Sequence, residues 1–281
     1  MLRGQHAQAG TLLLVGFLLL AQPPAAPAWE GRAHRLIAAR AIGSLPYPLR
    51  GFFEANRLSL VQLCADPSLW GEVPRRPEQG FIQLDFYGRF PFPELPRDYN
   101  DSVRKFGRET LTEHGILPWQ VGTYSLKLEE AFRNQQWDQV KLYAAVLARY
   151  VGEAHDPFNT TMNSNGQLSN QLGVESRYAI SLVDRYQMFF IIRPGGAYKI
   201  EDPTAHAFGM VLEAHTWVDN ILLADSQARS GKLDYNDDYY DAFYTAAGPI
   251  LIRQLTNASQ NVGAYWYTAW VNAGSPTPPL R

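Results

Sequence analysis

Residues 147–186 read LARYVGEAHDPFNTTMNSNGQLSNQLGVESRYAISLVDRY, and the fold assignment depends on this stretch. It opens at the end of a helix in which apolar residues such as Leu142 and Val146 recur at helical spacing. Pro157 and the polar residues 159–173 interrupt that pattern, and a second helical pattern follows them. The stretch therefore predicts two helices joined by a long polar loop.

Helical periodicity recurs along the rest of the chain, whereas alternating strand patterns are scarce. Clusters of Pro and Gly separate the helical stretches. These stretches cover roughly residues 99–113, 174–192, 204–226, 236–254 and 257–272. The longest loop runs from about Asp66 to Asp98, and a loop of that length in a domain is usually functional or a packed lid. We predict an all-α fold with a single multi-helix domain.

The N-terminal segment has the features of a secretory signal peptide. Residues 1–28 have a basic start, an apolar run over residues 12–20 and a small-residue ending at Ala28. Cleavage after Ala28 would leave a helical domain over residues 29–281 with Trp29 at its N-terminus. We therefore predict an exported protein.

The composition of the chain indicates where the protein is located and which classes of partner are excluded. Cys64 is the only cysteine, so the chain cannot form an internal disulfide, and the bacterial periplasm or exterior suits it better than a eukaryotic secretory route. Its helix-spaced apolar neighbours favour a buried thiol over a nucleophile. The formal charge of −2 argues against nucleic acid as a partner. No segment approaches the roughly 18 uninterrupted apolar residues that a membrane span requires.

Residues 147–186 resemble a segment of the zinc-dependent phospholipase C and S1/P1 nuclease superfamily. That segment has the form L-x-H-Y-x-G-D-x-x-x-P-x-H, then a polar loop, then H-S-[RK]-[FY]-E, and this chain follows it almost position by position. The resemblance extends over about residues 29–275 and includes GILPW at 115–119 and AWVNAG at 269–274. It implies a divergent bacterial member of a family of metal-dependent phosphoric ester hydrolases.

The resemblance also implies which residues would bind metal. In the family the free amine and carbonyl of an N-terminal Trp bind metal, and Trp29 would take that place. His34 stands at the ligand position early in the first helix, and Asp66 stands at the position after the second. Glu153 and Glu175 keep a ligating oxygen at two further positions. In an active enzyme Asp66 would be the catalytic residue that positions water.

Other ligand positions of the family carry residues that cannot serve. Gly80 and Gln83 replace the His and the Asp of one motif, Asn159 replaces the His after the Pro, and Ala179 replaces an acid. Arg149 replaces the His one helical turn before Glu153. Arginine is not deprotonated in proteins and has no lone pair to donate, so it cannot ligate a metal.

These substitutions are incompatible with the three-metal phosphodiesterase centre that the resemblance implies. Such a centre uses closely spaced metals to polarise the phosphoryl oxygen and to activate water, and only a dense set of imidazoles and carboxylates offsets the charge. A guanidinium among the remaining ligands would repel the metals. We hypothesise that an Arg-carboxylate cluster has replaced them, with Arg149 one turn from Glu153 and facing Asp66 and Glu175.

Two further pairs of residues are weaker candidates for metal ligands. His155 and Asp156 are adjacent, so their side chains point in different directions, and the corresponding positions in the family are not ligands. His215 and Asp219 have the i, i+4 spacing of a metal-binding helix, but such pairs are common by chance.

The sequence leaves three functions open. The first is an exported pseudoenzyme that binds an unknown ligand in the former active-site cleft and needs no cofactor. The second is a divergent phosphodiester hydrolase, of phospholipase C or nuclease type, that retains one zinc ion or an altered ligand set. The third is a purely structural envelope component. Nothing in the sequence indicates an oligomeric state.

Overall fold

A computed structural model describes residues 31–231 and 234–279, so the predicted signal peptide and Trp29 lie outside the described residues. The α-helices are Gly31–Ser44 (α1), Leu49–Ala55 (α2), Arg57–Ala65 (α3), Tyr99–Phe106 (α4), Arg108–His114 (α5), Leu117–Arg133 (α6), Trp137–Glu153 (α7), Val174–Ser176 (α8), Leu182–Tyr186 (α9), Pro203–His215 (α10), Val218–Arg229 (α11) and Asp237–Asn272 (α12). The short turns are Pro67–Trp70 (η1), Pro77–Gln79 (η2), Leu84–Tyr87 (η3), Pro157–Thr160 (η4), Arg177–Ser181 (η5, a π-helical turn) and Gln187–Phe189 (η6). No strand occurs in the described ranges, which confirms the all-α prediction.

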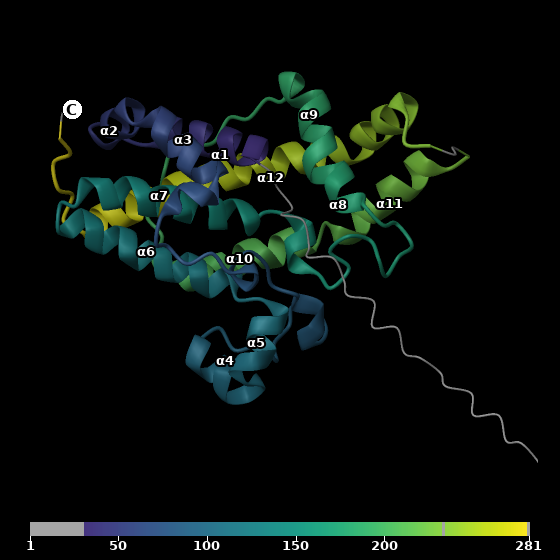
Figure 1. Cartoon of the computed structure of the whole chain (residues 1–281), viewed down its shortest axis with the longest axis horizontal. Helices are drawn as coiled ribbons and strands as arrows, with labels where there is room; N and C mark the ends of the chain where they lie inside the picture. The colour runs from purple at the N-terminus through teal and green to yellow at the C-terminus, as the bar shows by residue number, and fades with distance from the viewer. Residues whose placement is uncertain (1–30, 232–233, 280–281) are drawn as a thin grey trace, which may run out of the picture.

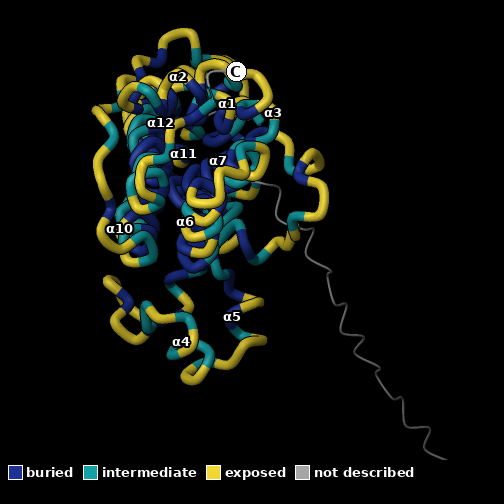
Figure 2. Tube along the Cα trace, turned by 90° about the vertical axis from the view of Figure 1, so that its left-hand side faces the viewer, coloured by how far each residue is buried: buried dark blue, intermediate teal, exposed yellow. Residues whose placement is uncertain are grey.

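The core lies around α12, which packs against α1, α6, α7 and α11 (Figures 1 and 2). Trp266 of α12 is fully buried, stacks on Phe53 with ring centroids 4.5 Å apart, and donates through Nε1 to the Ala144 carbonyl oxygen of α7 at 2.9 Å. Gly263 allows close approach of α1, since a Cβ there would lie 2.0 Å from Ser44 Oγ. The aromatic C-terminal helix thus packs in the core.

The C-terminal helix is longer than the sequence pattern predicts. We expected two helices with a break near residue 255, whereas α12 is continuous and contains Pro249 in its interior. An interior Pro costs a helix about 3 kcal/mol. Leu251, Leu255 and Val262 are all fully buried, and their packing against neighbouring helices offsets that cost.

Two other predicted helical stretches are divided. The stretch near 204–226 forms α10 and α11, and they separate at Thr216, whose hydroxyl donates back to the Glu213 carbonyl oxygen at 2.7 Å. The stretch near 174–192 ends at Phe189 and contains the π-helical turn η5 between α8 and α9. Such turns are frequent at functional sites, and this one carries Ala179, where the resemblance implies that the family has a metal ligand.

The long loop after Asp66 holds η1, η2 and η3 and leads into α4 and α5. Figure 1 shows α4 and α5 as a lobe below α6 and α10, and Figure 2 shows that little of this lobe is buried. The loop returns to the body where the Ile82 N–H donates to the Asn159 carbonyl oxygen at 2.8 Å. This contact places residues 80–83 beside η4. None of the helices in the described part of the chain is both long and apolar enough to cross a membrane.

Candidate functional site

His34 lies on the buried face of α1 and contacts the end of α7. It is completely buried, and its Nε2 lies 3.2 Å from Glu153 Oε1. Because a carboxylate accepts and does not donate, His34 Nε2 carries the proton in this contact. Gly152 makes room for the ring, since a Cβ there would lie 2.9 Å from His34 Nδ1.

Arg149 and Glu153 form the predicted pair on the last turn of α7. Arg149 Nη2 lies 3.1 Å from Glu153 Oε1, and the exposed fractions of the two side chains are 10% and 5%. The guanidinium also donates through Nη1 to the carbonyl oxygens of Cys64 and Ala65, at 3.5 and 3.4 Å. The ion pair is therefore buried, and the same guanidinium closes the C-terminal end of α3.

Asn159, in η4, completes the environment of the Glu153 carboxylate. Its Nδ2 donates to Glu153 Oε2 at 2.8 Å and to the Glu153 carbonyl oxygen at 3.2 Å. We call His34, Arg149, Glu153 and Asn159 the Glu153 cluster. In this cluster three side chains from α1, α7 and η4 direct N–H groups at one buried carboxylate.

Charge keeps Glu153 ionised in this environment. Burial by itself raises the pKa of Glu153, but the positive charge of Arg149, followed by His34 and the hydrogen bond from Asn159, outweighs burial. The pKa of Glu153 consequently lies below its ordinary value. The cluster is thus a compensated ion pair with an additional imidazole and amide.

A second acidic group lies just beyond the cluster. Burial, together with the negative charges of Glu175 and Glu153, raises the pKa of Asp156 well above its ordinary value. Its Oδ1 accepts from the Phe158 N–H at 2.9 Å, an N-cap of η4. Glu175, in α8, is also buried. The cap gives this buried acid a structural role at the start of η4.

The remaining predicted site residues are dispersed. Asp66 is exposed and caps η1, where its Oδ1 accepts from the Ser68 N–H at 2.9 Å. The pKa of Asp66 is lowered by the hydrogen bonds of Ser68 and more weakly by the charges of Arg75 and Arg149. Within the described residues Arg149 and Asp66 form no direct ion pair, although the charge of Arg149 still acts weakly on the Asp66 carboxylate. The physical reason is that the backbone of η1 takes the Asp66 carboxylate.

Three of the positions at which the family would have a metal ligand carry residues with structural roles here. Gly80 ends η2, and its N–H donates to the Pro77 carbonyl oxygen. Gln83 Oε1 lies 2.7 Å from His114 Nδ1, which ties the loop to the end of α5. Ala179 is buried in η5. Its methyl group offers no ligand where the family would have an acid.

Within the described part of the chain, the residues of the Glu153 cluster do not fit a zinc centre. Both carboxylate oxygens of Glu153 already accept hydrogen bonds from the protein. Oε1 accepts from the permanent cation Arg149 and from the protonated Nε2 of His34, and Oε2 accepts from Asn159 Nδ2. No group of three or more His, Cys, Asp or Glu side chains in the described part of the chain is arranged to hold a metal ion. Trp29 lies outside that part.

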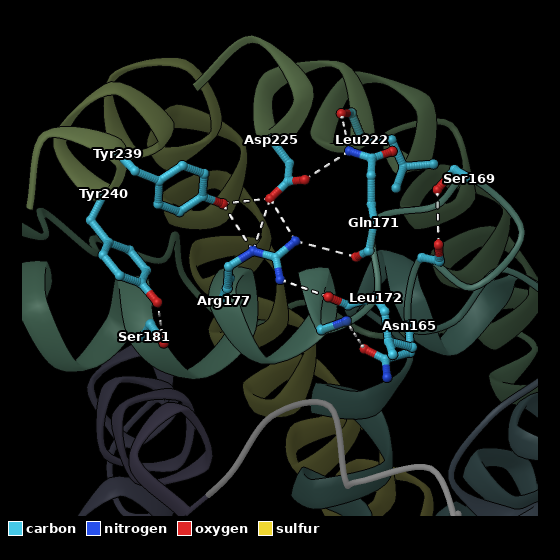
Figure 3. Close-up of polar contacts among 12 residues, drawn as sticks. Asn165, Ser169, Gln171, Leu172, Arg177, Ser181, Leu222, Asp225, Tyr239 and Tyr240 are labelled. Atoms are coloured by element: carbon cyan, nitrogen blue, oxygen red, sulfur yellow. Dashed lines mark hydrogen bonds and ion pairs between the residues drawn. The ribbon is translucent and has the colours of Figure 1, made fainter. Parts of the chain in front are cut away.

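A second buried arginine was not singled out from the sequence. Arg177, in η5, bonds Asp225 of α11 through Nε and Nη2 at 2.9 and 2.8 Å, and Tyr239 of α12 donates to the same oxygen (Figure 3). Gln171 Nε2 donates to the other Asp225 oxygen at 2.8 Å. We call Arg177, Asp225, Tyr239 and Gln171 the Asp225 cluster. The only sequence signal was that Arg177 stands at the basic position of the H-S-[RK]-[FY]-E motif.

His155 belongs to a third buried network. Asn261 Nδ2 donates to His155 Nε2 at 2.9 Å, so His155 Nδ1 is the protonated nitrogen and donates to Gln254 Oε1 at 3.2 Å. Burial lowers the pKa of His155 to about 4. The imidazole is therefore neutral and joins α7 to α12. His155 and Asp156 point into different networks, as their adjacency predicts.

Comparisons with known proteins bear on the fold. No family model and no curated protein matches the chain. In solved structures the chain is similar to the alpha toxin from Clostridium absonum, at a TM-score of 0.53 and 11% identity, over 87% of this chain and 65% of that one. It is similar to the alpha-toxin of a Clostridium perfringens avian strain at a TM-score of 0.53 and 10% identity, over 89% and 66%.

These similarities confirm the predicted fold, the all-helical fold of the phospholipase C type. At 10 to 11% identity they show the fold alone. This chain also spans just under two thirds of the length of the toxin chains, 65 and 66%. The chemistry must therefore be argued from the residues of this chain.

Proposed function

We propose that this chain is an exported, non-catalytic binding protein, a pseudoenzyme that keeps a phospholipase C-type fold without its metal centre. One observation carries the proposal. Glu153 stands where the family has a metal-binding carboxylate, and here it accepts from Arg149 at 3.1 Å and from Asn159 at 2.8 Å. Both donors occupy positions at which the family has imidazole ligands.

The substitutions form a coherent set because each replaces what the metal supplied. A metal neutralises a buried carboxylate, and the guanidinium of Arg149 provides that positive charge. An imidazole ligand holds its acceptor nitrogen toward the metal, whereas the Asn159 amide directs a donor at Glu153. If the metal had been lost and its ligands replaced at random, the Glu153 carboxylate would be buried without a partner. A buried, unpaired carboxylate costs the folded state free energy. The pairing supports a site stabilised in its metal-free form.

A small cavity supports the binding role. About 270 Å³ of space adjoins the former ligand position Ala179 and is bounded by Ala33, Arg35, Ile180 and Val183. Its walls combine aliphatic side chains with the guanidinium groups of Arg32 and Arg35 and with the Asp184 carboxylate, which pairs with Arg32 at 2.8 Å. Such a lining suits a small polar or charged ligand. We propose that the ligand of the pseudoenzyme occupies this part of the former cleft.

Metal analysis of the purified, exported protein after extensive dialysis tests the proposal. We expect no stoichiometric zinc and no chelator-sensitive hydrolysis of a simple phosphodiester such as bis(p-nitrophenyl) phosphate. One zinc ion per chain together with chelator-sensitive hydrolysis would replace the proposal with the alternative, a divergent hydrolase in which Trp29, His34, Asp66 and the two glutamates hold one ion.

A gain of metal binding provides the complementary test. The variant Arg149→His/Asn159→His places two imidazoles around Glu153 beside His34, and it should bind zinc measurably more tightly than the natural chain. The matched control is Arg149→Gln/Asn159→Gln, which removes the cation without adding a ligand. Equal zinc binding by the two double variants, measured by titration calorimetry, would contradict a replaced metal centre.

A further inference from the structure

A polar cavity of about 560 Å³ lies beside the Asp225 cluster, and we call it the α11 cavity. Residues 169–171 of the loop before α8 form one wall, residues 225–230 at the end of α11 contribute the second, and Tyr235 forms the third. Every residue of the lining carries a polar side chain. Most sites for small molecules are largely apolar, so this lining suits a ligand that is itself strongly polar.

The Asp225 cluster forms the floor of the α11 cavity. The Asp225 side chain is 2% exposed, and Arg177 and Tyr239 both donate to one of its carboxylate oxygens. Gln171 Nε2 donates to the other oxygen at 2.8 Å (Figure 3). Because both oxygens are occupied and the charge is paired with Arg177, this carboxylate is compensated within the protein. A ligand in the cavity therefore meets a floor without net charge.

Arg229, in the last turn of α11, brings a positive charge to the wall. Its guanidinium carbon lies 4.2 Å from the centre of the Tyr235 ring. In the described ranges no ion pair and no hydrogen bond engages this guanidinium. The carbonyl groups at the end of α11 favour a cation there without supplying a full negative charge. Stacking on Tyr235 thus holds the guanidinium in place and leaves its N–H groups available.

The acidic residues nearby do not cancel the charge of Arg229. Asp225 is neutralised within its own cluster. Asp234, Asp237 and Asp238 are exposed and are not part of the lining, and Asp237 already forms an ion pair. Exposed carboxylates outside the cavity are screened by water and salt. The lining therefore carries one positive charge that is not paired.

Neutral hydrogen-bonding groups surround that charge. Asn170, Ser226 and Ser230 all line the α11 cavity, and within the described residues their side chains make no hydrogen bond to the protein. Two hydroxyl groups and a carboxamide can each donate and accept. This combination matches a ligand that has both an anionic group and several hydroxyl groups.

We propose that the α11 cavity binds a small polyhydroxylated anion, a sugar acid or a sugar phosphate. Its carboxylate or phosphate bonds to the Arg229 fork, which can offer two parallel N–H groups to either anion. Its hydroxyl groups bond to Asn170, Ser226 and Ser230. A neutral sugar would leave the guanidinium without its counter-charge, and an inorganic ion would leave the hydroxyl and amide groups to water.

This inference goes beyond the pseudoenzyme proposal and does not depend on it. The α11 cavity shares no residue with the Glu153 cluster or with the cavity beside Ala179. Binding there requires no metal and no reaction. Titration with sugar anions therefore tests the α11 cavity, while zinc analysis tests the Glu153 cluster.

Titration calorimetry of the purified protein with glucose 6-phosphate and with glucuronate tests the proposal. We expect at least one of the two to bind at one saturable site per chain, with a Kd of about 1 mM or tighter. The tighter of the two identifies the anionic group as phosphate or carboxylate. Glucose alone and inorganic phosphate alone should each bind about tenfold more weakly or worse, because each lacks one set of contacts.

Variants of the wall assign the binding to the α11 cavity. Arg229→Gln should weaken binding of the sugar anion by about tenfold or more, because a hydrogen bond to a charged group is lost. The matched control is Arg193→Gln, which removes the same charge from an exposed residue outside the lining and should bind like the natural protein. Ser226→Ala/Ser230→Ala should weaken binding by about threefold or more, since neutral hydrogen bonds contribute less. Thermal unfolding checks that each variant is folded.

Three results would overturn the proposal. Neither sugar anion could show saturable binding up to about 10 mM, or Arg229→Gln could bind as tightly as Arg193→Gln. Equal binding of glucose or of inorganic phosphate would show that the cavity does not select a polyhydroxylated anion. If Arg229→Gln does not fold, Ser230→Asp takes its place, since it adds a negative charge at an exposed wall residue. Ser230→Asp should weaken binding by about tenfold, and unchanged binding would likewise reject the site.

Discussion

Arg149 and Arg177 are both buried and both bind a buried carboxylate, yet their surroundings differ. The Arg177 guanidinium contacts Asp225, Tyr239 and two carbonyl oxygens at 2.8 to 3.2 Å, and it lies over the Tyr235 ring at 4.0 Å. Arg149 reaches Glu153 at 3.1 Å and otherwise makes only contacts of 3.4 and 3.5 Å to backbone oxygens.

The two ion pairs differ in how closely their surroundings fit a guanidinium. The Asp225 cluster is shaped around a guanidinium, with planar donors meeting acceptors from η5, α11, α12 and the loop before α8 (Figure 3). The Glu153 cluster holds a guanidinium in a site whose geometry fits it less closely. Such a looser fit is what the proposed replacement of a metal centre by arginine leads us to expect. Substitutions at the two clusters can test the comparison.

The largest effect is expected at Arg177. Arg177→Ala leaves the Asp225 carboxylate buried and removes the link between η5, α11 and α12, so it should destabilise the protein by about 3 to 5 kcal/mol. Urea unfolding followed by circular dichroism measures the change. Tyr239→Phe removes one donor to the same carboxylate and should cost less than Arg177→Ala. If Arg177→Ala lowered the free energy of unfolding by less than Arg149→Ala does, the Asp225 cluster would not be the better-fitted of the two.

Arg149→Ala should also destabilise the protein, toward the lower end of that range, at about 3 kcal/mol. The matched control is Arg133→Ala on α6, because Arg133 and Glu129 form an exposed i, i+4 pair with the same spacing. Exposed helical pairs contribute only about 0.3 to 0.5 kcal/mol. Equal decreases in the free energy of unfolding for the two variants would show that the Arg149–Glu153 pair stabilises the protein no more than an exposed pair does.

The pH dependence of that difference should follow Glu153. Its pKa is lower in the folded chain than in the unfolded chain, so the unfolded chain binds a proton more readily as the pH falls. The stability gained from the Arg149–Glu153 pair is thus present above about pH 4.5 and is lost below it. The gap between the natural chain and Arg149→Ala, measured by urea unfolding from pH 7 to pH 3, should shrink accordingly. A constant gap would contradict a buried charge pair.

The smallest effect is expected at Asp66. The Asp66 side chain is exposed and caps η1 through the Ser68 N–H, without an ion pair to the guanidinium of Arg149. Asp66→Asn keeps the capping oxygen and should leave the unfolding midpoint unchanged, while Asp66→Ala should lower it slightly. In the double variant Asp66→Ala/Arg149→Ala the two losses should be nearly additive, because the charge of Arg149 acts on Asp66 only weakly. A coupling between the two substitutions would place Asp66 in the Glu153 cluster after all.

The features that depend on local spacing could be predicted from the sequence alone. Helical periodicity gave the all-α fold, and the i, i+4 spacing of Arg149 and Glu153 fixed their pair, because residues four apart on a helix are neighbours wherever the helix packs. The loss of ligand chemistry at Arg149 and Ala179 follows from residue type alone. These statements need no knowledge of how the helices are arranged.

The contacts between segments far apart in the chain became visible only in the tertiary structure. It turned the Asn159 amide toward Glu153, turned Asp66 toward Ser68, and brought Arg177 to Asp225. It also kept α12 continuous through a proline. The physical reason is that such contacts join residues far apart in the chain, so they depend on which helix faces pack together, and packing is a cooperative property of the whole core.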